Sequence, residues 1–194
     1  CTVFLFGCNF FCPWCYNPEL VLPEKIKKQA MIPEKDFFDF LKKRKGFLQG
    51  VVICGGEPTI NKDLPNFIKK IKELSYFVKL DTNGSNPKML KKLIDKKLID
   101  YVVMDVKLPK ERYSELKEPS SLDKRNSVPE DIEKSIKILK ESKIDYEFRS
   151  TVLPKAHSEE DIINIAKWIK GSRIYYLQQF RPEKTLDPKY ERYK

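Results

Sequence analysis

The chain has 194 residues, of which 41% are hydrophobic and 34% are charged, and its formal net charge is +10. This length suits one domain and is short of the roughly 250 residues of a full eightfold β/α barrel. No stretch approaches the about 20 apolar residues of a membrane span and no secretory signal opens the chain, so we expect neither a membrane protein nor a secreted one.

Five cysteines without a secretory context favour a reducing compartment, and we expect a cytoplasmic protein. The lysines mostly fall in pairs interleaved with acidic residues, and residues 42–45 form the only dense basic run. This pattern favours solvated helix faces over a nucleic-acid surface. We expect a single domain over residues 1–194. Because the chain begins at Cys1 rather than at methionine, we also expect some native N-terminal residues to be missing.

Six segments rich in Val, Ile, Phe and Tyr predict strands, and several are apolar almost throughout, as strands buried on both faces are. In chain order they are Thr2–Phe6, Val51–Cys54, Phe77–Thr82, Tyr101–Val106, Tyr146–Val152 and Arg173–Gln179. Amphipathic helices are predicted between them, opening at Asp36, Asp63, Asn86, Ser127 and Ser158. The alternation predicts right-handed crossovers and a parallel α/β sheet of six units.

Local signals mark several boundaries of these helices. Asn86 is followed by proline at the first helical position, Ser158 and Asp161 form a capping-box pattern, and Gly171 stands where a helix ends. A short helical segment is predicted near residues 109–116, and residues 118–128 read as a surface loop.

The segment Cys8-Asn-Phe-Phe-Cys12-Pro-Trp-Cys15 directly follows the first predicted strand. Three closely spaced thiolates can hold three irons of a [4Fe–4S] cluster and leave the fourth iron open for a ligand. Zinc is the alternative, but a zinc site usually has four ligands. The other cysteines are Cys1 and Cys54, and His157 lies far along the chain in a polar segment. The spacing favours iron over zinc.

Polar residues also end the later strands, and the active site of a parallel α/β fold gathers at the carboxyl ends of its strands. The second strand runs into Gly55-Gly56-Glu57-Pro58. Adjacent glycines let a ligand come close to the backbone, and the alternative is that they form a tight turn between strand and helix. Charged or polar residues at the other strand ends are Asp81, Thr82, Asp105, Lys107, Arg149 and Arg181. A structural ion pair is the alternative explanation for such half-buried charges.

The cysteine motif, with Trp14 before its last cysteine, followed by Gly-Gly-Glu-Pro, resembles the radical S-adenosylmethionine (radical SAM) superfamily. The sequences GCNFFCPWCYNPEL, GGEPT, LDTNG and MDVK are similar to glycyl-radical-enzyme activases, above all to activating proteins of anaerobic ribonucleotide reductase. The resemblance covers nearly the whole chain and implies a partial (β/α)6 barrel. Tyr16 departs from the pattern, since these activases usually have histidine there.

The resemblance also implies the site. Cys8, Cys12 and Cys15 would hold a [4Fe–4S] cluster, and S-adenosylmethionine would bind its open iron. The further cofactor-binding positions are Trp14, Gly55, Gly56, Glu57, Asp81, Thr82, Asp105, Lys107 and Arg149. Of these, Lys107 would face the carboxylate of S-adenosylmethionine and count among the catalytic residues, and Asp81, Thr82 and Asp105 would lie near its methionine part or a monovalent cation. Cys54 reads as a buried thiol.

The implied activity is anaerobic. A one-electron donor such as ferredoxin or flavodoxin would supply the electron that cleaves S-adenosylmethionine, and the resulting 5′-deoxyadenosyl radical would take hydrogen from a glycine of a partner enzyme. That partner would be anaerobic ribonucleotide reductase. One alternative is a radical enzyme acting on a small molecule, as 7-carboxy-7-deazaguanine synthase does. Another is a non-enzymatic metal-binding or RNA-binding module, which would leave the strand-end charges unexplained.

Overall fold

The computed structural model describes residues 1–116, 128–154 and 156–192. Its centre is one sheet of six parallel strands, and their order in space follows their order in the chain. The strands are Thr2–Leu5 (β1), Gly50–Gly55 (β2), Phe77–Thr82 (β3), Tyr101–Asp105 (β4), Asp145–Val152 (β5) and Tyr175–Gln179 (β6). All six predicted strands are confirmed, with ends that shift by one or two residues at most.

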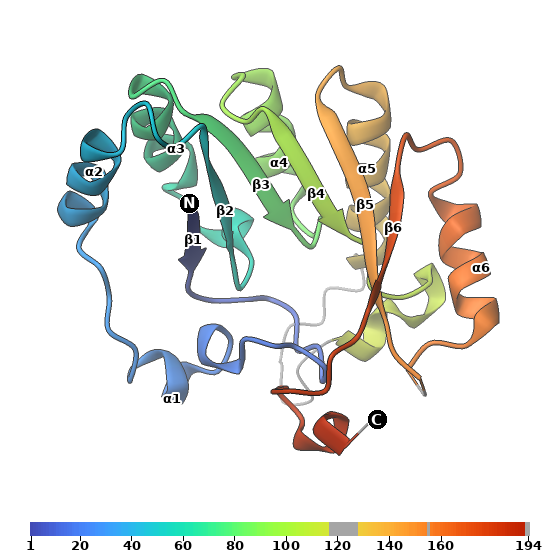
Figure 1. The fold of residues 1–194 in the computed structure, drawn as a ribbon. Coiled ribbons are helices and arrows are strands. Elements are labelled where there is room, and N and C mark those ends of the chain that lie inside the picture. The colour runs from blue at the N-terminus through green and yellow to red at the C-terminus, as the bar shows by residue number, and fades with distance from the viewer. Residues whose placement is uncertain (117–127, 155, 193–194) are drawn as a thin grey trace.

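The helices lie outside the curved sheet, with α3, α4, α5 and α6 along one face and α2 near the β1 edge (Figure 1). Their bounds are Pro23–Ile26 (α1), Glu34–Lys43 (α2), Leu64–Glu73 (α3), Pro87–Asp95 (α4), Val128–Glu141 (α5) and Glu159–Trp168 (α6). Short 3-10 turns cover Pro18–Leu20, Pro58–Ile60, Lys110–Leu116 and Pro188–Arg192. Strands β1 and β6 form the two edges and do not pair. The sheet is therefore an open, partial barrel, as predicted.

Two of the predicted helix caps are confirmed in atomic detail. The Asn86 side chain accepts a hydrogen bond from the Met89 N–H at the start of α4 (3.2 Å). Ser158 and Asp161 form a reciprocal capping box at α6, with bonds of 3.1 and 2.8 Å. Shortly after α6, Gly171 adopts a positive φ of 84°. Such a backbone conformation favours glycine where a helix has ended.

Three other helix starts turn out differently or are not described. The prediction that Asp36 caps a helix is wrong, because α2 begins at Glu34 directly after Pro33, which places Asp36 inside the first turn. Asp63 does occupy the cap position of α3, but its carboxylate accepts from the Asn66 side chain (2.6 Å) instead of from the backbone. Ser127 and most of the predicted loop over 118–128 lie outside the described residues.

The two faces of the sheet differ in environment. Ile53, Leu80, Met104 and Phe148 are fully buried under the helices. The opposite face, toward the inside of the partial barrel, carries several half-buried polar and charged side chains, namely Cys54, Asp81, Asp105 and Arg149. The expectation that strands are buried on both faces is thus wrong for most of the inner face, because an open barrel leaves that face partly accessible.

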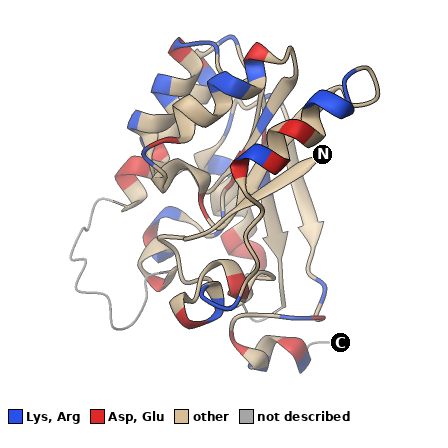
Figure 2. Ribbon diagram, turned by 90° about the vertical axis from the view of Figure 1, so that its left-hand side faces the viewer, with Lys and Arg blue, Asp and Glu red and all other residues tan. Residues whose placement is uncertain are grey.

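The helix surfaces carry most of the charge. Figure 2 shows basic and acidic residues interleaved along the helices rather than separated on two sides. Among the described residues, no helix is both long and apolar enough to cross a membrane.

Candidate active site

All six strands run in the same direction, so their carboxyl ends meet at one edge of the sheet. The loop after β1 and the chain after β6 both lie at this edge (Figure 1). The bond from the Asp187 N–H to the Pro13 carbonyl (2.8 Å) joins these two segments directly. The predicted site residues therefore share one end of the fold.

The three predicted ligand cysteines lie on the loop that follows β1. Cys12 is buried with 7% of its surface exposed, and Cys8 and Cys15 are half-buried. The Cys15 N–H donates to the Cys12 carbonyl (3.0 Å), and the Phe10 N–H donates to the Cys8 sulfur (3.4 Å). The loop's own backbone thus fixes where the thiols stand relative to one another.

The donor chemistry of the three cysteine thiols is that of an iron–sulfur cluster, which thiolates hold. In residues 1–116, 128–154 and 156–192, no three His, Cys, Asp or Glu side chains are placed to hold one ion. Three thiols of a zinc site would meet at one point, whereas each thiolate of a [4Fe–4S] cluster binds a different iron. Burial raises the pKa of Cys8 and of Cys12 to about 12, and also raises the pKa of Cys15. Bound positive irons would stabilise the thiolates that burial disfavours.

The charge of Lys107 acts on all three cysteine thiols of the loop. Its positive charge opposes the rise in the pKa of Cys8, Cys12 and Cys15. Its ammonium contacts an Asp105 carboxylate oxygen at 3.1 Å. Burial works to lower the pKa of Lys107, but the charge and hydrogen bond of Asp105, together with the charges of Cys12 and Cys15, outweigh burial and raise it. The ammonium therefore stays charged beside the cysteine loop.

The backbone of Lys107 is held by two aromatic side chains that were not among the predicted site residues. Its N–H donates to the hydroxyl of the fully buried Tyr113 (3.0 Å), and its carbonyl lies 2.7 Å from His157 Nε2. The His157 ring also packs edge-on against Trp14 of the cysteine loop, with centroids 5.6 Å apart. His157 is thus distant from the cysteine motif in the sequence but is buried against the loop in the fold.

The charged residues at the ends of β3, β4 and β5 form one network. The Arg149 guanidinium lies between two carboxylates, with its Nε 2.8 Å from Asp105 and a terminal nitrogen 3.7 Å from Asp81. Lys79 approaches the other Asp81 oxygen at 3.4 Å. Ion pairs therefore join Asp81, Asp105, Lys107 and Arg149 at the ends of these strands.

The two carboxyl groups of this network differ in acidity. Burial raises the pKa of Asp81, against the opposing charges of Lys79 and Arg149. Burial also works to raise the pKa of Asp105, but Lys107 and Arg149 outweigh it and hold that pKa below its ordinary value. Asp105 is thus the ionised centre of the network.

The Glu57 carboxylate turns away from the inner face and ties β2 to β3. It is fully buried and accepts bonds from the Thr59 N–H (3.0 Å), the Thr82 hydroxyl (2.7 Å) and the Asn83 N–H (2.6 Å), and from the Thr59 hydroxyl as well. Burial raises its pKa, while these bonds oppose the rise. The side chains of Glu57 and Thr82 therefore bind each other.

Gly55 and Gly56 are required by a close approach of the chain to itself. A Cβ on Gly56 would lie 1.9 Å from the Gly7 carbonyl oxygen, and one on Gly55 would lie 2.2 Å from that of Leu5. The N–H groups of Gly56 and Glu57 donate to the Leu5 and Gly7 carbonyls (2.9 and 2.7 Å). Among the described residues, neither glycine carbonyl accepts a hydrogen bond from outside the sheet. These carbonyls remain as acceptors at the site.

Tyr16, where the sequence departs from the expected histidine, links the cysteine loop to the end of β6. Its ring stacks on Phe180 with centroids 5.6 Å apart, and its hydroxyl accepts from the Arg181 N–H (2.7 Å). The Arg181 side chain is exposed. Arg149 belongs to the charge network of the inner face, whereas Arg181 does not.

Comparison with known proteins identifies a family and relatives of this chain. A family model described as the radical SAM superfamily matches residues 2–169. A proposed glycyl-radical enzyme activating enzyme of Methanocaldococcus jannaschii is 37% identical over 194 residues, which cover 98% of this chain and 77% of that protein. The 7-carboxy-7-deazaguanine synthase of Aquifex aeolicus is 33% identical over 81 residues, which cover 41% of this chain and 33% of the synthase.

Solved structures with the same fold share little sequence with the chain. The crystal structure of Streptococcus suis SuiB bound to S-adenosylmethionine superposes with a TM-score of 0.65 at 21% identity, covering 93% of this chain and 40% of SuiB. At this level of identity the likeness concerns the fold.

Proposed function

The chain belongs to the radical SAM superfamily, and from this premise we propose that it activates a glycyl-radical enzyme, anaerobic ribonucleotide reductase. The superfamily uses a [4Fe–4S] cluster and S-adenosylmethionine. When bound, the cluster supplies the electron that cleaves S-adenosylmethionine to methionine and a 5′-deoxyadenosyl radical. The observation that carries the proposal is the convergence of three partly or fully buried thiols with the Lys107 ammonium at the carboxyl edge of an open parallel sheet.

The chain's own residues would bind and orient these groups. Cys8, Cys12 and Cys15 would hold the cluster, and the buried ring of Trp14 excludes water from one side of the loop. The carbonyls of Gly55 and Gly56 would accept from the methionine ammonium, since no contact outside the sheet engages them in the described residues.

The charge network supplies the complementary charges. The Lys107 ammonium would pair with the methionine carboxylate, and such charge-assisted hydrogen bonds are among the strong ones. Asp81, Asp105 and Arg149 would fix the position of Lys107 and the shape of the inner face. A monovalent cation beside Asp81 and Asp105 stays a prediction, and Arg149 already supplies positive charge between these two carboxylates.

Several observations favour a protein substrate. The M. jannaschii relative, with its activase name, matches 98% of this chain. The unpaired edges β1 and β6 leave one side of the barrel open, which would admit a loop of a partner enzyme.

The test is a glycyl-radical signal in electron paramagnetic resonance. Anaerobically reconstituted protein, reductant, S-adenosylmethionine and a candidate anaerobic ribonucleotide reductase are expected to yield the radical. The same reductase with its candidate glycine changed to alanine should yield none. If S-adenosylmethionine is cleaved but no reductase gains a radical, the activase proposal fails.

A second candidate function is a radical reaction on a small molecule. The 33% identity to the A. aeolicus 7-carboxy-7-deazaguanine synthase over 81 residues favours it. Formation of a carboxylated deazaguanine by the reconstituted protein, without any partner enzyme, would support this candidate over the activase.

Replacement of Lys107 tests the binding of S-adenosylmethionine. Lys107→Met is expected to weaken that binding by about tenfold to a hundredfold, because a hydrogen bond to a charged group contributes about 1.5–3 kcal/mol. Isothermal titration calorimetry on cluster-loaded protein measures the change. Lys110→Met is the matched control, since Lys110 forms an exposed ion pair with Glu133 (2.8 Å). Equal affinities in the wild type and Lys107→Met would remove Lys107 from the binding site.

A further inference from the structure

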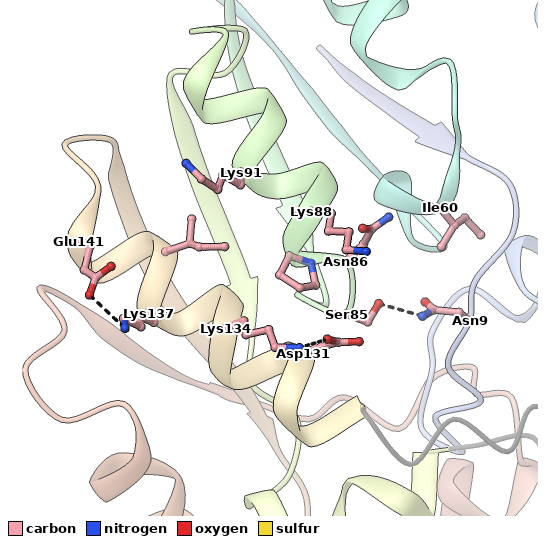
Figure 3. A pocket seen from close by; sticks show the side chains of 12 residues that line it. Asn9, Ile60, Ser85, Asn86, Lys88, Lys91, Asp131, Lys134, Lys137 and Glu141 are labelled. Carbon is pink, nitrogen blue, oxygen red and sulfur yellow. Dashed lines mark hydrogen bonds and ion pairs between the residues drawn. The ribbon is translucent and has the colours of Figure 1, made fainter.

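A groove of about 830 Å³ lies between α4 and α5, on the outside of the barrel (Figure 3). Lys88 and Lys91 of α4 line it from one side, and Lys134 and Lys137 of α5 from the other. Its remaining lining residues are Asn9, Ile60, Ser85, Asn86, Pro87, Asp131, Ile138 and Glu141. Four lysines against two acidic residues make the groove basic.

The lysines of this groove are free to exchange partners. Lys134 and Lys137 contact acidic residues of their own helix at 3.0 and 3.8 Å, and Lys91 contacts Asp95 of α4 at 2.9 Å. All three lysine side chains are more than 60% exposed, and exposed pairs of this kind contribute only about 0.2–1 kcal/mol. Lys88 forms no ion pair with any described residue.

One end of the groove reaches the cysteine loop. Asn9, the residue after Cys8, lines the groove and is the only exposed residue between Gly7 and Tyr16. Its amide donates to the Ser85 hydroxyl (2.8 Å), and its carbonyl oxygen accepts from the Asn83 side chain (3.1 Å). These bonds connect the loop to the start of α4. The groove is thus a basic surface that leads to a position directly beside a predicted cluster ligand.

The chain must receive its electron from outside. Besides the three loop cysteines it has only Cys1 and Cys54, too few for a second four-cysteine cluster. The overall step balances with one external electron: the donor is oxidised by one electron, the sulfonium of S-adenosylmethionine is reduced by one, and its C5′–S bond breaks into methionine and the 5′-deoxyadenosyl radical. Electron transfer weakens steeply with distance, so the donor has to dock close to the loop.

We propose that the α4–α5 groove is the docking surface for an acidic electron-donor protein. This inference rests on the reductive chemistry of the proposed function. Interspersed lysines steer an acidic partner and speed its association, and electron-transfer encounters use small, transient interfaces. Single-stranded nucleic acid does not fit, because no aromatic side chain lines the groove for base stacking.

Charge reversal on both sides of the groove tests this assignment. The double variant Lys88→Glu/Lys134→Glu is compared with Lys42→Glu/Lys43→Glu on α2, which changes the net charge equally within the densest basic run. The probe is reduced flavodoxin, and S-adenosylmethionine cleavage is measured against flavodoxin concentration. The groove variant is expected to lose about tenfold to a hundredfold in kcat/KM for flavodoxin, and to show a weaker salt dependence than the wild type. The α2 variant should keep the wild-type kcat/KM for flavodoxin and the wild-type salt dependence.

Two further measurements separate this proposal from the proposed function. With dithionite in place of flavodoxin, the groove variant is expected to cleave S-adenosylmethionine at the wild-type rate, which shows that its defect lies in donor docking. Binding of flavodoxin, followed by calorimetry without turnover, should weaken in the groove variant alone. The docking assignment would be overturned if both double variants lost the same amount of flavodoxin-driven cleavage. It would also be overturned if the groove variant lost as much cleavage with dithionite as with flavodoxin. Absence of cleavage by the wild type with dithionite would contradict the enzyme function, and the binding measurement would still decide the groove.

Discussion

Cys12→Ser protein is expected to lose its iron and, with it, all cleavage of S-adenosylmethionine. Cys12 is the most deeply buried of the three loop cysteines. Its replacement leaves two thiolates where the cluster needs three, and a serine hydroxyl does not supply a comparable soft ligand. Iron and sulfide content, the broad iron–sulfur absorption and the yield of 5′-deoxyadenosine after anaerobic reconstitution should all fall to background.

Cys54→Ser is the matched control for this experiment. Cys54 is half-buried on β2, and burial raises its pKa as it does for the loop cysteines. It lies within a strand and outside the cysteine loop that follows β1. Iron content equal to that of the wild type is expected. Loss of iron in Cys54→Ser with retention in Cys12→Ser would contradict the assignment of the loop as the cluster site.

Glu57→Ala is expected to lower the free energy of unfolding by roughly 3–5 kcal/mol. The change leaves buried N–H and hydroxyl donors of Thr59, Thr82 and Asn83 without their acceptor. Each donor left unpaired costs about 1–3 kcal/mol, and the hydroxyls recover part of this by rotating. Urea denaturation of the wild type and the variant measures the difference.

The matched control is Glu160→Ala, at an exposed position of α6, and its stability should change by less than about 0.5 kcal/mol. If Glu57→Ala kept wild-type stability and lost only affinity for S-adenosylmethionine, the carboxylate would act on the ligand. The hydrogen bonds of Glu57 instead predict that the variant loses stability first and foremost.

The strands could be predicted well because they are local patterns. Apolar runs such as Phe77–Thr82 match the observed strands closely, and capping signals such as Ser158 with Asp161 work within one turn of helix. The order of strands then follows from right-handed crossovers, which place consecutive strands side by side. The start of α2 was not predicted, because Pro33 precedes the helix at the cap position and has no side chain that could cap it.

The contacts within the site could not be predicted in the same way. His157 is separated from Trp14 by more than 140 residues of sequence, and no spacing rule links them. Likewise, nothing local indicates that the Glu57 carboxylate turns toward Thr82 and Asn83 while its backbone faces the β1 end. Such pairings depend on how strands and loops pack after the sheet has formed.

Motif spacing and hydrophobic period are written along the chain, so they were enough to predict the family, the six parallel units and the cysteine loop. The contacts of the residues around that loop became visible only in the folded structure. In the fold, the Glu57 carboxylate binds Thr82 and Asn83. Lys107 contacts Asp105, Tyr113 and His157. Asn9 lies at the end of a basic groove. The physical reason is that a buried polar group needs a hydrogen-bond partner. Packing in three dimensions, and not distance along the sequence, determines which partner lies within reach.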